Sequence, residues 1–321
     1  MIYRTSIALL LAGVVTACVP REENVRFTSG NLSLAGTLVS PRGRGPFPAI
    51  VFIHGSGPDS RENYRGQALW FARQGFAALI YDKRGVGEST GDWRYVHFSE
   101  LADDALAAVR LLRTRKDIRS ERIGLWGGSN GGWVAPLATA RDSGVAFLIT
   151  VAGAAWTPAE LAKWRSVTRV QSAGFPDSVV RRVADLMDLQ AALIRRDGWD
   201  LGWRRYQAAL SPYRHEAWTR PMSALRNPLG DTSWFMPYTA DIDFDPLPVI
   251  RLVRAPMLAL LGAEDPIVPA RETAALLASV TKANLTVRVL EGANHDMSPE
   301  NSTQPVAEYW NTMRSWLRTL W

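Results

Sequence analysis

The chain has 321 residues, 47% of them hydrophobic and 21% charged, a globular composition that allows one large α/β domain with an insertion or two small domains. The formal net charge of +6 comes from arginine, because lysine occurs only at positions 83, 116, 163 and 282. The arginines form no basic run and no stripe interleaved with aromatic residues, which argues against a nucleic-acid partner.

The first residues are predicted to be a bacterial export signal. Arg4 supplies the positive start, and the apolar core from Ile7 to Val15 is too short to span a membrane. The small residues that follow end at Cys18, the only cysteine, and the sequence Val-Thr-Ala-Cys resembles the lipobox of bacterial lipoproteins. We therefore expect residues 1–17 to be a lipoprotein signal peptide and Cys18 to be lipidated. The lipid would hold the exported protein to a membrane of the cell envelope, on its periplasmic face; the alternative is a plain secretory signal.

Strands then alternate with helices, which favours a mostly parallel twisted sheet flanked by helices. Runs 25–27 and 32–39 around Ser29-Gly30-Asn31 predict a hairpin. Continuous apolar runs predict strands buried on both faces at 49–53, 76–81 and 145–151. Helices are expected up to about Gln74 and, with Ser99 as N-cap, over 100–115.

The pattern changes over residues 157–240, where strand runs disappear. Apolar side chains recur at helical spacing with charged residues on the other side, as at Val183 and Leu186 beside Arg182. Strands return at 255–262 and 285–290, with helices over 271–280 and 304–320. We therefore predict an α/β core made of residues 18–156 and 241–321, and a helical cap insertion over 157–240. The tryptophans of the insertion are expected mainly to form its own core.

The sequence Gly127-Gly128-Ser129-Asn130-Gly131 is the stretch around which the chain is organised. It lies between a short apolar run of strand character and a helical segment, which is the context that a G-x-S-x-G nucleophile elbow requires. Glycines at positions 127 and 131 permit the close approach of helix and strand. Ser129 is therefore the candidate nucleophile.

A serine hydroxyl needs a base and an acid that orients the base. Of the four histidines, His295 directly follows the last predicted strand, so it should lie above Ser129 at the carboxyl edge of the sheet. Asp265 follows the strand at 255–262, and we prefer it to Glu264 because the shorter acid precedes a proline turn. The chain order Ser129, Asp265, His295 is that of α/β-hydrolases.

The oxyanion of a tetrahedral intermediate needs two preset donors. The backbone N–H of Asn130, directly after the nucleophile, is one candidate. The other is the N–H of Ser56 in His54-Gly55-Ser56-Gly57, where small residues allow a close approach. No cluster of histidine, cysteine and carboxylate residues has the spacing of a metal site.

These motifs together resemble the α/β-hydrolase superfamily, in particular bacterial esterases related to dienelactone hydrolases and to the catalytic domains of acylaminoacyl peptidases. The resemblance covers roughly residues 30–155 and 245–320. It is carried by five motifs, which are 54–58, 81–89, 127–132, 262–265 and 294–295. One departure is Gly128, where many members carry histidine. The resemblance implies ester hydrolysis, no cofactor, a cap over the site, and a structural ion pair between Asp82 and Arg84.

The sequence therefore predicts a serine hydrolase that cleaves small-molecule carboxylic esters through an acyl-enzyme. Tryptophans of the insertion would make an apolar roof over Ser129, and the absence of any sign of an extended groove favours acyl groups from acetate to roughly hexanoate. Two alternatives remain: a serine peptidase of the acylaminoacyl type, and a non-catalytic binding lipoprotein.

Overall fold

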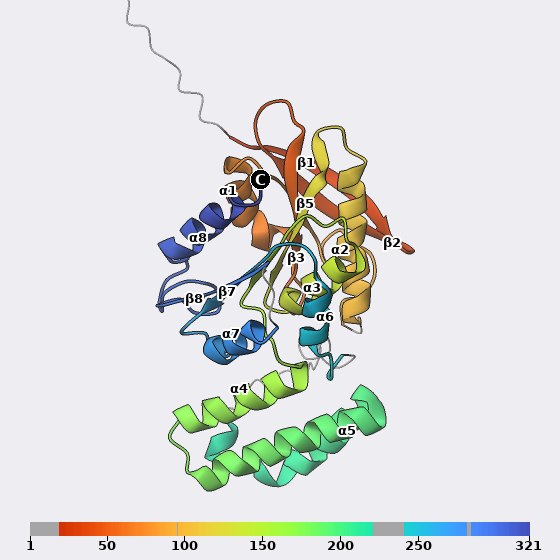
Figure 1. Ribbon diagram of the computed structural model, residues 1–321. Coiled ribbons are helices and arrows are strands. Elements are labelled where there is room, and N and C mark those ends of the chain that lie inside the picture. Colours follow the sequence, from red (N-terminus) through yellow and green to blue (C-terminus); the bar gives the residue numbers. More distant parts are fainter. Residues whose placement is uncertain (1–18, 95, 221–240, 281–283) are drawn as a thin grey trace, which may run out of the picture.

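The computed structural model describes residues 19–94, 96–220, 241–280 and 284–321 (Figure 1). The predictions for the signal segment 1–17, for the lipidation of Cys18 and for the part of the insertion at 221–240 lie outside these residues. No helix in the described ranges combines the length and the apolar composition that crossing a membrane requires.

Eight strands form one sheet in the order β1-β2-β4-β3-β5-β6-β7-β8. The pairs β1·β2 and β2·β4 are antiparallel and all the others are parallel, so the predicted, mostly parallel sheet is confirmed. The strands are β1 (Arg21–Ser29), β2 (Leu32–Ser40), β3 (Phe47–Ile53), β4 (Ala77–Tyr81), β5 (Ile118–Gly128), β6 (Leu148–Val151), β7 (Met257–Gly262) and β8 (Leu285–Leu290).

Helices cover both faces of the sheet because alternate strand residues point in opposite directions. On β3, Val51 belongs to the core under one layer of helices and Phe52 to the core under the other. The first layer holds α2 (Phe98–Arg113), α3 (Gly131–Arg141), α6 (Pro246–Leu252) and α7 (Ala270–Ala278), and the second holds α1 (Arg65–Arg73) and α8 (Ala307–Leu317). Figure 1 shows α1 and α8 together on the side of the sheet away from α2.

Helix α2 begins two residues earlier than the sequence predicts. His97, and not Ser99, is the N-cap. The N–H of His97 donates to Oε2 of Glu100 at 3.0 Å, and the N–H of Phe98 donates to Oδ2 of Asp241 at 2.6 Å. A carboxylate from 143 residues further along the chain therefore fixes the start of this helix, and local sequence gives no sign of it.

The insertion is helical in its described part. Helix α4 (Pro158–Ser172) and the long helix α5 (Asp177–Leu210), kinked at Gly198, lie together at the bottom of Figure 1, below α6 and α7. They share a small core of their own, in which Trp203 and Trp218 are buried and Trp199 stacks on Trp203 with ring centroids 4.9 Å apart. These tryptophans serve the packing of the insertion itself.

Candidate active site

Ser129 lies at a tight turn between β5 and α3. Its φ of +52° is in the left-handed region, which costs energy for a residue with a side chain. A Cβ at position 127 would come within 2.2 Å of the carbonyl oxygen of Gly131, and one at position 131 within 2.7 Å of that of Ile53. Glycine is therefore required at both positions, and the turn presents the Ser129 hydroxyl at the carboxyl end of β5.

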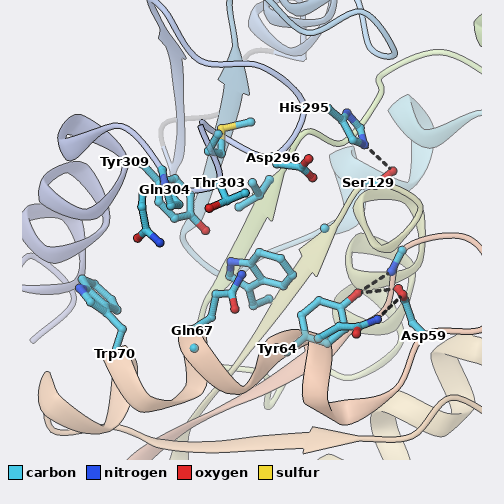
Figure 2. A pocket seen from close by; sticks show the side chains of 18 of the residues that line it. Asp59, Tyr64, Gln67, Trp70, Ser129, His295, Asp296, Thr303, Gln304 and Tyr309 are labelled. Atoms are coloured by element: carbon cyan, nitrogen blue, oxygen red, sulfur yellow. Dashed lines mark hydrogen bonds between the residues drawn. The ribbon is translucent and has the colours of Figure 1, made fainter. Parts of the chain in front are cut away.

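The structure brings the three predicted side chains into one hydrogen-bonded chain. His295 Nε2 lies 2.9 Å from Ser129 Oγ (Figure 2), and His295 Nδ1 lies 2.8 Å from Asp265 Oδ2. Because an ionised carboxylate only accepts hydrogen bonds, Nδ1 carries the proton and Nε2 is left to accept from the hydroxyl. Glu264, the neighbouring acid, is exposed, and the carboxylate hydrogen-bonded to His295 is that of Asp265.

Backbone contacts fix both members of the His295–Asp265 pair. Asp265 Oδ1 accepts from the N–H groups of Ile267 at 2.7 Å and Val268 at 3.0 Å, which leaves Oδ2 for the histidine. On the other side, Asn294 Oδ1 accepts from the N–H of Asp296 at 2.9 Å and closes the turn that carries His295. The side chain of Asp265 is only 1% exposed, so water does not compete for the bond.

The two predicted oxyanion donors also lie beside Ser129. Ser56 lines a large cavity together with Ser129, and Asn130 lines a small hollow that Ser129 also lines. Across the described ranges, neither backbone N–H has a hydrogen-bond acceptor. Both donors are thus available to an oxygen atom that develops negative charge above Ser129.

Two residues that sequence reasoning missed hold the loop that carries Ser56. The ammonium of Lys83 donates to the carbonyl oxygens of Gly55 at 2.8 Å and Gly57 at 3.1 Å. The hydroxyl of Tyr64 accepts from the N–H of Gly55 at 2.9 Å and donates to Asp59 at 2.7 Å (Figure 2). Burial lowers the pKa of Lys83 to about 8. The sequence does contain one sign of this role, because Lys83 directly follows a buried strand and lies within a charged motif.

The ion pair expected between Asp82 and Arg84 does not form. Arg84 instead binds Asp104 of α2 through two hydrogen bonds at 2.8 and 2.9 Å, and it also contacts Glu100. Asp82 accepts from the N–H groups of Arg61 and Glu88. The two side chains reach different partners because β4 ends at Tyr81 and the chain turns at Arg84, so the two residues do not share one face of a strand. The motif still ties loops beside the site to the core, through separate partners.

His54 is buried beside the site, and its ring nitrogen Nε2 contacts the carbonyl oxygen of Tyr81. Burial, assisted by the charge of Lys83, lowers the pKa of His54 from 6.5 to about 4. Between these values the unfolded chain binds a proton that the folded protein does not bind. The free energy of unfolding should therefore fall as the pH falls from about 6.5 toward 4.

This predicts that His54→Gln flattens the acid limb of the stability profile. Between pH 7 and 4.5 the wild type should lose about 2 to 3 kcal/mol more than the variant, which can still donate to Tyr81 but cannot be charged. Urea unfolding at the two pH values measures this difference. His215→Gln, at an exposed histidine of the insertion, is the control and should follow the wild type. Equal losses in all three proteins would contradict the prediction.

The large cavity has a volume of about 910 Å³ and extends from Ser129 and His295 along α1 and α8. Figure 2 shows Gln67, Trp70 and Tyr309 around the part of the cavity that lies away from Ser129. This extended space is larger than the sequence led us to expect. The small hollow beside Asn130 has a volume of only about 10 Å³.

The expected roof of tryptophans is wrong for the described part of the insertion. The insertion residues found to line the large cavity and the small hollow are Arg165 and Leu161 of α4, and none of them is a tryptophan. Trp199, Trp203 and Trp218 pack inside the insertion, and Trp164 packs on Trp156. Trp234 lies outside the described residues. In those same described ranges, no group of three or more histidine, cysteine or carboxylate side chains is placed to hold a metal ion.

The sheet order, the flanking helices and the turn at Ser129 together define the α/β-hydrolase fold. Comparison with known proteins agrees, since residues 45–201 match the family described as "Serine aminopeptidase, S33". Among solved structures, the α/β-hydrolase GrgF from Penicillium sp. is similar with a TM-score of 0.59 and 21% identity, over 93% of this chain and 96% of that one. An esterase from Pyrococcus furiosus is similar with a TM-score of 0.60 and 15% identity, over 94% and 91%.

Curated relatives are similar in sequence over part of their length. The esterase EstD of Thermotoga maritima is 26% identical over 85% of this chain, and the thiohydrolase apmlB of Arthrinium phaeospermum is 35% identical over 40% of it. The chain spans 60% of the first relative and 42% of the second.

Proposed function

We propose that the chain is a serine hydrolase that cleaves carboxylic esters of small acyl groups through an acyl-enzyme intermediate. The observation that carries the proposal is the continuous contact from Ser129 Oγ through His295 to Asp265, at 2.9 and 2.8 Å. Similarity to the esterase EstD supports the choice of an ester substrate.

In the proposed reaction, His295 Nε2 takes the proton of Ser129 as Oγ attacks the carbonyl carbon of the ester. The oxyanion that forms accepts from the N–H groups of Ser56 and Asn130. The C–O bond to the alcohol then breaks, and the alcohol leaves with the proton from His295. Water repeats the cycle on the acyl-enzyme, releasing the carboxylic acid and restoring the serine hydroxyl.

A fluorophosphonate probe tests the proposal, because it forms a covalent bond only with an activated serine. The wild-type protein should be labelled and Ser129→Ala should not be. Peptide mapping should place the label on Ser129. Labelling that persists in the Ser129→Ala variant would contradict the assignment of the nucleophile.

The preference for small acyl groups is a separate prediction. If the alcohol part of the ester, and not the acyl part, occupies the large cavity, kcat/KM should decline from p-nitrophenyl acetate and butyrate to octanoate and palmitate. A maximum at palmitate would mean that the acyl chain occupies the large cavity and would overturn the prediction.

Peptide hydrolysis is the second candidate, favoured by the match of residues 45–201 to serine aminopeptidases. The two functions differ in the leaving group, because an amine requires more assistance from a general acid than an alcohol does. An N-acetyl-aminoacyl anilide in the same substrate panel separates them. Faster turnover of the anilide than of the butyrate ester would favour the peptidase.

We also propose that lipidation of Cys18 anchors the protein to the bacterial cell envelope. Labelled palmitate should then enter the wild-type protein in cells, and Cys18→Ser should prevent its incorporation. A single acyl chain gives only marginal membrane binding, whereas several chains hold a protein firmly. The wild type should therefore sediment with membranes and the variant should not. Equal incorporation in both proteins would contradict the proposal.

A further inference from the structure

In the described part of the insertion, residues 157–220, Arg165 of α4 is the cationic residue that lines the candidate site. It lines both the large cavity and the small hollow, each of which also contains Ser129. Its Nε is fully buried and has no hydrogen-bond partner among the residues that the structure describes. A buried N–H of a charged group without an acceptor is costly, so this position requires an explanation.

The other cations of the described insertion are satisfied in one of two ways, apart from Arg169. Some contact a carboxylate or an aromatic ring: Lys163 with Asp188, Arg182 over Tyr213, Arg195 with Asp243, and both Arg196 and Arg205 with Asp197. The rest are exposed to water: Arg181, Arg204, Arg214 and Arg220. Arg165 is half-buried and forms no ion pair within the described ranges. The one acid of α4, Glu160, is occupied by Thr157 at the start of the helix.

Arg169, one turn further along α4, adds a second positive charge without a counter-ion in the described ranges. Burial lowers its pKa, and the charge of Arg165 lowers it further. Two like charges on one helical face repel each other and destabilise the helix. An anion bound beside Arg165 would remove both the repulsion and the unsatisfied donor.

Asn130 supplies a second unsatisfied group in the same place. It is 1% exposed, and within the described part of the chain neither its Nδ2 nor its Oδ1 has a hydrogen-bond partner. It lines the small hollow together with Arg165. A hollow of about 10 Å³ has room for about one polar atom, such as one oxygen of a carboxylate whose remaining atoms lie in the large cavity.

The other charged groups around the large cavity do not neutralise Arg165. Asp59 accepts from Asn63 and Tyr64, and its charge lies near the ammonium of Lys83. Asp296 is exposed to water, and Arg73 is exposed at the end of α1. The unmatched charge at the buried end of the site is therefore positive.

We propose that Arg165, assisted by the amide Nδ2 of Asn130, binds a carboxylate group of the ester substrate. The substrate class is then an ester that carries a second, ionised carboxyl group, such as a half-ester of a short dicarboxylic acid. A guanidinium donates two parallel hydrogen bonds to a carboxylate, which gives both affinity and orientation. This inference rests on the proposed function and makes Arg165 a determinant of specificity.

Matched ester pairs test the proposal by hydrolysis. Monoethyl glutarate and ethyl pentanoate compare the charge on the acyl part, and 4-acetoxybenzoate and 4-acetoxybenzamide compare it on the alcohol part. In at least one pair the wild type should favour the anion by about tenfold or more in kcat/KM. Arg165→Gln should reduce that ratio to about one, and Arg165→Lys should retain part of it.

Arg204→Gln removes one exposed charge from the same insertion and should keep the wild-type ratio. A wild type that prefers the neutral ester of both pairs, or a ratio unchanged in Arg165→Gln, would overturn the proposal.

Binding measured without turnover separates this proposal from the esterase activity itself. Calorimetry of monoethyl glutarate or 4-acetoxybenzoate with Ser129→Ala should give an affinity that falls about tenfold in Ser129→Ala/Arg165→Gln, with both variants folded by circular dichroism. If no ester is hydrolysed but this difference appears, the proposed function fails and the carboxylate site stands. If esters are hydrolysed and the two variants bind both anions equally, the site fails and the function stands.

Discussion

Ser129→Ala and His295→Ala should each lower kcat for p-nitrophenyl butyrate by about 10⁶-fold, and the double variant should lose little more. The hydroxyl is the attacking group and the imidazole is its base, so removing either one stops the same step. The two losses are not additive because the residues act as a unit, linked by the 2.9 Å contact between Oγ and Nε2. The residual rate would come from the oxyanion donors and from substrate binding.

Single-turnover kinetics on the purified variants measures these losses, with thermal unfolding as the check on folding. Ser120→Ala and His215→Ala are matched controls, because both residues are exposed and neither lines the large cavity or the small hollow. Both controls should keep the wild-type rate within a few-fold. A double variant whose loss equals the product of the two single losses would show that Ser129 and His295 act independently.

The sequence predicted those parts of the molecule that local pattern determines. Buried parallel strands have continuous apolar runs, so the strand at 49–53 was placed within β3, whose last five residues are all buried. The turn at Ser129 could be placed because a strained φ and close backbone contacts restrict positions 127 and 131 to glycine. The residues that follow parallel strands meet at one edge of the sheet, which is why Asp265 and His295 could be assigned together.

The sequence could not predict contacts that depend on distant segments. The N-cap of α2 was misplaced because the carboxylate that caps Phe98 comes from Asp241. Arg84 was paired with the wrong acid because Asp104 belongs to a helix that only tertiary packing brings close. The sequence also could not show which residues of α4 lie near Ser129. The spacing of apolar residues identifies the buried face of a helix, but it does not identify the loop that the helix covers.

Asp265→Asn should lower kcat by about 10⁴-fold while the fold is kept. Asn can still accept from the N–H groups of Ile267 and Val268 through its amide oxygen, as Asp265 Oδ1 now does. Its amide nitrogen would then face His295 Nδ1 as a donor, so the imidazole would place its proton on Nε2. That tautomer cannot accept from Ser129, and the positive charge that forms on the imidazole during attack would lose its carboxylate partner.

The control for this prediction is Glu264→Gln, which makes the same chemical change at the exposed neighbouring residue and should leave kcat within a few-fold. The pH profile adds a readout that loss of folding would not give. At higher pH hydroxide assists deprotonation of the serine, so the activity of Asp265→Asn should rise with pH beyond the range in which the wild type has reached its plateau. If Glu264→Gln caused the large loss and Asp265→Asn did not, Glu264 would be the orienting acid and the observed 2.8 Å contact between His295 Nδ1 and Asp265 Oδ2 would not be the functional one.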